Sequence, residues 1–167
     1  SLDAGNGEKI PLLREVLDAV AGRAGLNIEL KGEGTAALTA QVIGNYVMGQ
    51  RLDYRHLIVS SFHHESLLEV ARHDSKILLG VLLEKITEDH VRLAERTGAY
   101  SIHVDKKIVD GEIVADLHER GMKVFVYTVN HPQEVREMKR MGVDGIFTDY
   151  PEICLETGNN GGIGPKG

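Results

Sequence analysis

Apolar and polar residues alternate along this chain with two different periods, one typical of helices and one typical of strands. After Pro11, residues 12–20 carry apolar side chains at helical spacing, whereas residues 26–31 alternate strictly between apolar and polar positions. The same criteria predict further strands at residues 56–62, 77–83, 99–104, 124–129 and 143–148. They predict helices between these strands, at residues 35–52, 64–72, 87–98, 110–121 and 130–142.

The predicted strands recur at a nearly even spacing of about 20 residues after the first interval, which is the length of one strand–helix unit. Such alternation requires parallel strands joined by right-handed crossovers, because each helix returns the chain to the same end of the sheet. An open doubly wound sheet and a closed (β/α)8 barrel both satisfy this rule. The even spacing, and the lack of a glycine-rich phosphate loop after any predicted strand, favour the barrel.

The number of predicted strands is too small for a closed barrel. A (β/α)8 barrel has eight strands and about 250 residues, whereas this chain has 167 residues and six predicted strands. Because the first long element is a helix and residues 1–7 are polar and turn-like, we expect the first two βα units to be missing. The sequence therefore predicts an α/β fold, a partial TIM-type barrel at residues 1–155, and a flexible glycine-rich tail at residues 156–167.

Composition and charge exclude several function classes. The net charge is −6, from 19 Lys and Arg against 25 Asp and Glu, and no basic cluster interrupts it, which argues against nucleic-acid binding. The longest apolar stretch, residues 77–83, is too short to span a membrane. Cys154 is the single cysteine and cannot form an internal disulfide, which favours a cytoplasmic location and leaves the periplasm open. Homo-oligomerisation stays open.

The first predicted strand carries the clearest candidates for chemistry. If its apolar positions pack against helices, Asn27, Glu29 and Lys31 face the barrel interior near the carboxyl end of the strand. An acidic and a basic side chain are costly there unless they pair, bind a metal ion or contact a charged ligand. The sequence therefore predicts a functional role for Glu29 and Lys31, and an internal ion pair between them is the structural alternative.

Polar residues also follow the second predicted strand. In residues 60–64, Phe62 could form the wall of a pocket, whereas His63 and His64 diverge and are more typical of surface or helix-capping positions. His103, at a strand end, is the strongest candidate among the other histidines, and no zinc motif is present in the sequence. Polar residues close the last two predicted strands, where such barrels often bind phosphate: Tyr127, Thr128, Asn130, Thr148 and Asp149.

Four segments together carry a resemblance to a known family. They are Asn-Ile-Glu-Leu-Lys at 27–31, Val-Ser-Ser-Phe at 59–62, Val-Tyr-Thr-Val-Asn at 126–130 and Gly-Val-Asp-Gly-Ile-Phe-Thr-Asp-Tyr-Pro at 142–151. In this order they resemble the C-terminal two thirds of the glycerophosphodiester phosphodiesterase family. The resemblance implies a (β/α)8 barrel. It also implies a hydrolase of lipid and glycerol metabolism that cleaves a small-molecule substrate, a glycerophosphodiester, and releases an alcohol and glycerol 3-phosphate with the help of Ca²⁺ or Mg²⁺.

The resemblance also implies roles for individual residues. Glu29 matches a metal ligand and Lys31 a residue that approaches the phosphate, while Phe62 and Tyr127 match aromatic residues that line the substrate cleft. The family commonly has Trp at the position of Tyr127.

The family's general acid and base histidines and its other carboxylate ligands belong to the two βα units that this chain lacks. We therefore expect no catalytic residue within this chain, and we expect the chain alone to be inactive. Two alternatives stay open: a non-catalytic barrel remnant or interaction module, and a barrel related to phosphatidylinositol-specific phospholipase C.

Overall fold

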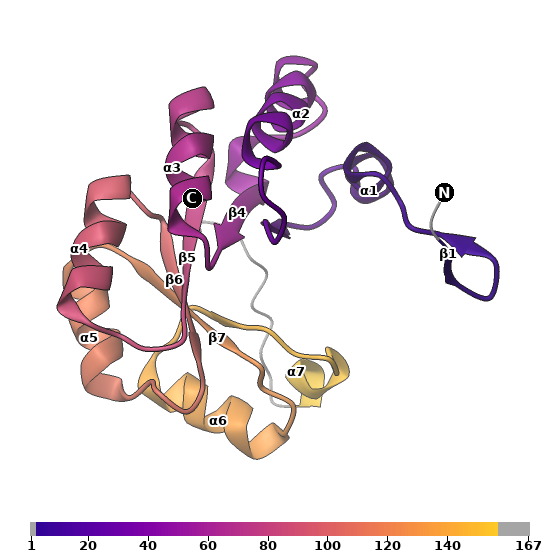
Figure 1. Ribbon diagram of the computed structural model, residues 1–167. Helices are drawn as coiled ribbons and strands as arrows, with labels where there is room; N and C mark the ends of the chain where they lie inside the picture. Colours follow the sequence, from indigo (N-terminus) through magenta and orange to yellow (C-terminus); the bar gives the residue numbers. More distant parts are fainter. Residues whose placement is uncertain (1–2, 157–167) are drawn as a thin grey trace.

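The computed structural model describes residues 3–156, and its centre is a sheet of six parallel strands. The strands lie side by side in the order of the sequence: β3 (Leu26–Glu29), β4 (Leu57–Ser61), β5 (Leu78–Leu83), β6 (Ser101–Asp105), β7 (Lys123–Tyr127) and β8 (Gly145–Ile146). Every neighbouring pair is parallel, so each connection crosses over the sheet. The sheet curls as six of the eight strands of a barrel would, which confirms the predicted incomplete barrel (Figure 1).

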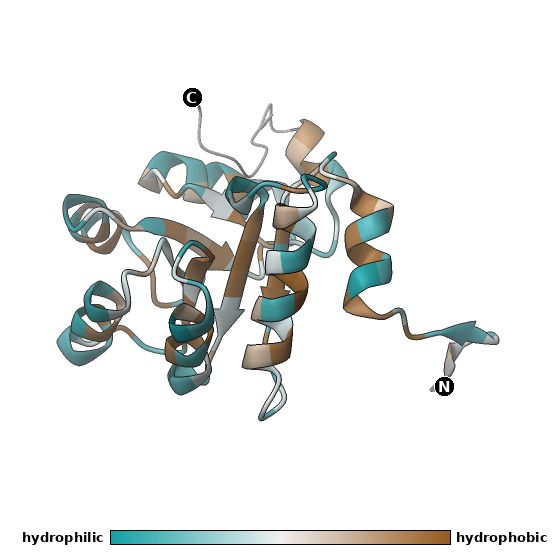
Figure 2. Cartoon of the chain, turned by 90° about the horizontal axis from the view of Figure 1, so that it is seen from above, coloured by the Kyte–Doolittle hydropathy of each residue, from teal (hydrophilic) through white to brown (hydrophobic). Residues whose placement is uncertain are grey.

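Helices connect these strands and cover the convex side of the sheet (Figure 1). They are α2 (Ala36–Met48), α3 (His64–His73), α4 (Glu88–Thr97), α5 (Gly111–Glu119) and α6 (Pro132–Met141), with a short 3-10 helix, η1 (Tyr54–His56), before β4. Figure 2 shows apolar strands inside and helices whose hydrophilic residues face outward. Val59, Val81 and Val124 on the strands pack against helical residues such as Leu67 and Val114, and all five are at most 1% exposed.

At the starts of α4 and α5 and at the end of α6, local capping signals place the helix ends where the sequence predicts them, whereas the helix predicted at residues 35–52 ends at Met48. Thr87 Oγ1 accepts a hydrogen bond from the His90 amide at the start of α4, and Asp110 Oδ1 accepts one of 2.8 Å from the Ile113 amide at the start of α5. Gly142 ends α6 with a φ of +83°, a left-handed conformation that glycine adopts without strain.

The ends of the described chain differ from the predictions. Strands β1 (Asp3–Gly5) and β2 (Glu8–Lys9) form an antiparallel hairpin where only turns were predicted. With helix α1 (Leu13–Val20) the hairpin extends to one side of the barrel (Figure 1). A short helix, α7 (Glu152–Glu156), follows β8 and was not predicted. Most of the predicted tail, residues 157–167, lies outside the described residues. No helix in residues 3–156 is long and apolar enough to cross a bilayer.

Candidate active site at the carboxyl ends of the strands

Strand register decides which side chains face the concave side of the sheet. Asn27 pairs with Ile58 and Glu29 with Ser60, and Ser60 in turn pairs with Gly80. Register partners in neighbouring parallel strands point to the same face, so these residues share one face of the sheet. The alternate apolar residues of β3 pack into the core beneath the helices. The predicted inward direction of Asn27 and Glu29 is therefore confirmed.

A cleft of about 300 Å³ opens at the carboxyl ends of the strands. It brings together the residues that the sequence singled out on three different strands. The lining residues are Asn27, Glu29, Lys31, Phe62, Leu82, Tyr127, Thr128 and Phe147. Sequence reasoning did not assign Leu82 and Phe147 to this cleft. Their positions in the inward register of β5 and beyond β8 were the signal that could have found them.

The two charged residues of the cleft lie at its rim. Lys31 Nζ is 3.6 Å from Glu29 Oε2, and the side chains are 78% and 30% exposed. An ion pair this exposed contributes roughly 0–1 kcal/mol. The structure thus contains the predicted ion pair, but the pair lies at the rim of the cleft and not in the barrel interior. At the rim, both charged groups can reach a ligand.

Two aromatic rings form one wall of the cleft. The rings of Phe62 and Tyr127 meet edge to face, with centroids 6.1 Å apart and planes at 78°. The Tyr127 hydroxyl donates a 2.9 Å hydrogen bond to the Leu83 carbonyl. Burial raises the pKa of Tyr127 to about 12, with smaller contributions from the nearby carboxylates of Asp105 and Glu84. Tyr127 therefore presents an uncharged ring whose hydroxyl is already bonded.

A serine on the outer face of β4 connects the segments that carry Lys31 and Phe62. The hydroxyl of Ser61 donates to the Leu30 carbonyl at 2.8 Å and accepts from the His63 amide at 3.0 Å. His63 itself is exposed, and the described lining of the cleft includes neither it nor His64. The His64 ring contacts the Leu82 carbonyl through Nε2 at 3.1 Å. Both histidines thus take structural positions, as the sequence analysis favoured.

His103 is not at the mouth of the barrel, contrary to its expected place at a strand end. Strand β6 continues two residues beyond it, so its ring lies fully buried on the concave face between Phe125 and Phe147, each 5.2 Å away. Its Nε2 atom is hydrogen-bonded to the Ser101 hydroxyl at 2.8 Å. Burial lowers the pKa of His103 to about 3. A histidine that is fully buried and stays neutral in this way cannot act as a general acid or base in the cleft.

In the part of the chain that the structure describes, three buried polar atoms of the sheet lack a hydrogen-bond partner. Asn27 Oδ1, Ser60 Oγ and His103 Nδ1 are buried without a hydrogen-bond partner among residues 3–156. Asn27 and His103 also line an inner cavity of about 20 Å³, room for about one water molecule. Asn27 therefore borders both the cleft and the interior.

The cleft supplies only part of a cation site. Glu29 contributes the one carboxylate among the described lining residues, and Asn27 Oδ1 adds an unpaired oxygen; both are ligand types that Ca²⁺ and Mg²⁺ prefer. Within residues 3–156, no three or more His, Cys, Asp or Glu side chains are placed to hold a metal ion. The described residues alone do not form a complete cation site.

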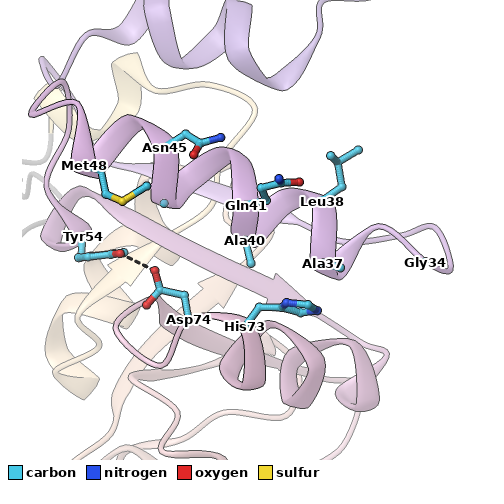
Figure 3. Close-up of a pocket in the computed structure, with 11 residues that line it drawn as sticks. Gly34, Ala37, Leu38, Ala40, Gln41, Asn45, Met48, Tyr54, His73 and Asp74 are labelled. Atoms are coloured by element: carbon cyan, nitrogen blue, oxygen red, sulfur yellow. Dashed lines mark hydrogen bonds between the residues drawn. The ribbon is translucent and has the colours of Figure 1, made fainter.

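A larger cavity, of about 720 Å³, lies on the outer layer along α2 and α3. Figure 3 shows Leu38 and Met48 toward its two ends, and the Tyr54 hydroxyl bonded to the Asp74 carboxylate. This hydrogen bond raises the pKa of Tyr54 to about 12. The cavity contains none of the inward-facing residues of the sheet, so the smaller cleft is the candidate active site.

Sequence comparisons match this chain to one family of known proteins. The sequence model of the glycerophosphoryl diester phosphodiesterase family matches residues 2–153. A glycerophosphodiester phosphodiesterase from Caldanaerobacter subterraneus is 32% identical over 162 residues, which cover 93% of this chain and 65% of that protein. One from Bacillus altitudinis is 33% identical, with 88% of this chain and 62% of that protein covered.

Solved structures show the same fold. A glycerophosphodiester phosphodiesterase from Parabacteroides distasonis superposes with a TM-score of 0.76 and 27% identity, over 93% of this chain and 66% of that one. An Oleispira antarctica phosphodiesterase, solved in complex with the product sn-glycerol-3-phosphate, gives a TM-score of 0.70 and 25% identity, over 81% of this chain and 56% of that one. This chain thus spans about two thirds or less of the length of each of these proteins.

Proposed function

Because this chain belongs to the glycerophosphoryl diester phosphodiesterase family, we propose that the complete protein hydrolyses glycerophosphodiesters to an alcohol and glycerol 3-phosphate. The observation that carries this proposal is the convergence of Glu29, Lys31, Phe62 and Tyr127 in one cleft. A carboxylate, an ammonium group and an aromatic wall suit the cation, the phosphate and the carbon chain of such a substrate. The product-bound Oleispira enzyme supports the same product class.

Glu29 and Lys31 would have different electrostatic roles, one toward a cation and the other toward the phosphate. Glu29, with the Asn27 oxygen from the same face of β3, would hold a divalent cation, Ca²⁺ or Mg²⁺, together with ligands from outside the described residues. When bound, such a cation neutralises charge on the phosphate oxygens. Lys31 is 78% exposed, so its ammonium group is mobile enough to leave the loose pair with Glu29 and contact a phosphoryl oxygen.

Phe62 and Tyr127 would position the organic part of the substrate. Because the Tyr127 hydroxyl is bonded to the Leu83 carbonyl, the ring offers the substrate an apolar edge and not a second polar group. Packing of the glycerol carbons against these rings would orient the ester relative to the charged rim.

Proton transfer is the part of the reaction that this cleft does not provide. Its described lining includes no histidine, and its one carboxylate is assigned to the cation. We propose that the general acid and base belong to the two βα units outside this chain, and that the chain alone is inactive.

The test is the substitution Glu29→Gln in the complete protein. Loss of the carboxylate should lower cation-dependent turnover of glycerophosphocholine by about 100-fold or more, since the cation contributes several kcal/mol of charge stabilisation. Glu112→Gln, an exposed change on α5, is the matched control and should leave turnover unaltered. Undiminished activity of Glu29→Gln would remove Glu29 from the site.

The same assay separates the alternative functions. A complete protein that hydrolyses phosphatidylinositol and not glycerophosphocholine would favour the phospholipase C relationship. A complete protein that cleaves neither, with Ca²⁺ or with Mg²⁺, would favour the non-catalytic remnant.

A further inference from the structure

A continuous set of hydrogen bonds joins the loops that follow β6, β7 and β8, and Asn130 lies at its centre. We propose that Asn130 is a positioning residue that holds the wall of the cleft in place without contacting the substrate. The consequence for turnover rests on the proposed function, whereas the coupling of the loops does not.

Both terminal atoms of the Asn130 side-chain amide form hydrogen bonds with the loop after β8. Its Nδ2 donates to Asp149 Oδ2 at 2.8 Å, and its Oδ1 accepts from the Asp149 amide at 3.0 Å and from the Thr148 hydroxyl at 3.3 Å. Thr148 Oγ1 in turn accepts from the Tyr150 amide at 3.1 Å. The Asn130 side chain therefore bonds directly to two successive residues of the neighbouring loop, and the Thr148 hydroxyl extends the connection to Tyr150.

The backbone of Asn130 extends the connection in the opposite direction. Its amide donates to Glu134 Oε2 at 3.1 Å, and Glu134 Oε1 accepts from Lys106 Nζ at 2.6 Å. The side chains of Lys106 and Glu134 are only 27% and 25% exposed, so this pair is better shielded than the rim pair of the cleft. The Lys106 amide also donates to the Tyr127 carbonyl at 2.8 Å. Three loops at the carboxyl ends of the strands thus form one hydrogen-bonded unit.

This unit lies directly behind the residues that line the cleft. Asn130 follows Thr128 by two residues, Asp149 follows Phe147 by two residues, and the Val129 amide donates to the Phe147 carbonyl at 2.8 Å. Thr128 and Phe147 line the cleft, whereas the described lining does not include Asn130 or Asp149. Through these contacts Asn130 sets the position of the wall that a bound substrate would meet.

The chemistry of the amide explains why asparagine suits this position. The Asn130 side chain donates a hydrogen bond to a carboxylate through Nδ2 and accepts hydrogen bonds from an amide and a hydroxyl through Oδ1. An aspartate has nearly the same shape but would place a second negative charge 2.8 Å from Asp149 Oδ2. Asn130→Asp therefore removes the donor to the Asp149 carboxylate and replaces that bond with repulsion, with almost no change in volume. Exchanging the two side chains places a donor opposite an acceptor again.

The experiment compares Asn130→Asp with the exchange variant Asn130→Asp/Asp149→Asn in the complete protein, well below the melting temperature. A misplaced wall weakens substrate binding, so Asn130→Asp should raise the KM for glycerophosphocholine by about tenfold or more. A merely structural role would instead lower the fraction of folded enzyme, which decreases kcat and leaves KM unchanged. The exchange variant should recover KM to within about threefold of wild type. Asn45→Asp, on the exposed face of α2, is the control for the added charge.

Hydrogen exchange provides a readout that does not require activity. The amides of residues 127–130 and 147–150 should exchange about tenfold or more faster in Asn130→Asp, and the exchange variant should restore their protection. Amides of β5 should be unaffected. Unchanged exchange in Asn130→Asp, an unchanged KM in an active enzyme, or a loss that the exchange variant does not recover would each overturn the proposal. If the wild-type protein shows no turnover but the two variants still show this exchange pattern, the proposed function is refuted and the coupling of the loops through Asn130 is supported.

Discussion

The imidazole ring of His103 fills the space that a side chain on residue 80 would need. A Cβ atom added to Gly80 would lie 2.7 Å from both Cε1 and Nε2 of His103 and 3.2 Å from Cγ2 of Ile58. The two residues face the same side of neighbouring strands, so the histidine ring lies over the glycine. This contact explains why a glycine interrupts the otherwise apolar strand β5. Phe125 and Gly145 repeat the arrangement between β7 and β8, with a closest approach of 2.7 Å.

Replacing Gly80 with alanine should destabilise the fold. The added methyl group would overlap the His103 ring, and overpacking of a filled interior costs about 1–3 kcal/mol. Gly111→Ala is the matched control, because a Cβ atom at the start of α5 meets nothing within 4 Å. Urea unfolding of both variants measures the difference, and a Gly80→Ala protein as stable as Gly111→Ala would contradict the close contact.

The buried His103 should make stability depend on pH. Its folded pKa of about 3 lies below the ordinary value of 6.5, so the unfolded chain takes up the proton first. The stabilising contribution is therefore complete above about pH 6.5 and falls by about 1.4 kcal/mol for each unit of decreasing pH, until the folded pKa is reached. The His103 ring signal in an NMR titration should stay constant between about pH 7.5 and 4.5. A signal that moves in this range would show that the ring takes up a proton in the folded state.

Asp144 should contribute to stability as a charged acceptor. Its carboxylate, 19% exposed, accepts from His118 Nε2 at 2.7 Å, Lys123 Nζ at 2.8 Å and the Val124 amide at 2.9 Å. Burial alone would raise the pKa of Asp144, but these three bonds outweigh it and hold the pKa below 3.8. Asp144→Asn should cost about 1–3 kcal/mol at neutral pH.

The cost of Asp144→Asn should itself depend on pH. Because the folded pKa is lowered, the contribution of the carboxylate is complete above its unfolded value of 3.8 and is lost as the pH falls through the folded value. The difference in melting temperature between wild type and Asp144→Asn should therefore shrink below about pH 4. Glu119→Gln, at an exposed site on α5, is the control. An undiminished difference at low pH would mean that the charge is not the cause.

The amino-terminal cap of α5 should be sensitive to the loss of an acceptor. Asp110 Oδ1 accepts from the Ile113 amide at 2.8 Å, and loss of such a cap costs about 1 kcal/mol. Asp110→Ala should lower the free energy of unfolding by about this amount, whereas Asp110→Asn keeps an acceptor oxygen and should retain most of it. Equal losses in the two variants would indicate that charge, and not the hydrogen bond, stabilises this helix end.

Short-range signals made most of the fold predictable. The strict alternation of residues 26–31 fixed which side of β3 faces the concave surface, because successive side chains of a strand point to opposite faces. Thr87, Asp110 and Gly142 each satisfied a backbone requirement at a helix end, and such requirements depend only on nearby residues.

The predictions were less accurate where a distant segment decides the structure. The last strand was predicted at residues 143–148 but contains only Gly145–Ile146, and the polar groups of Thr148 and Asp149 bond to Asn130 instead. His103 was expected at a strand end, and its burial follows from the two further residues of β6, from the Phe125 ring on β7 and from the Phe147 ring just beyond β8.

The sequence by itself determined the order of the elements, the inward direction of Glu29 and the membership of a family, because each depends on local spacing and on short segments of residues. Only the tertiary structure decided that Glu29, Lys31, Phe62 and Tyr127 border one cleft, that their charged pair lies at its rim, and that Asn130 joins the loops behind it. In the cleft, Glu29 and Tyr127 lie about 100 positions apart in the sequence. They come together only because the curvature and register of a parallel sheet bring the carboxyl ends of its strands to one place.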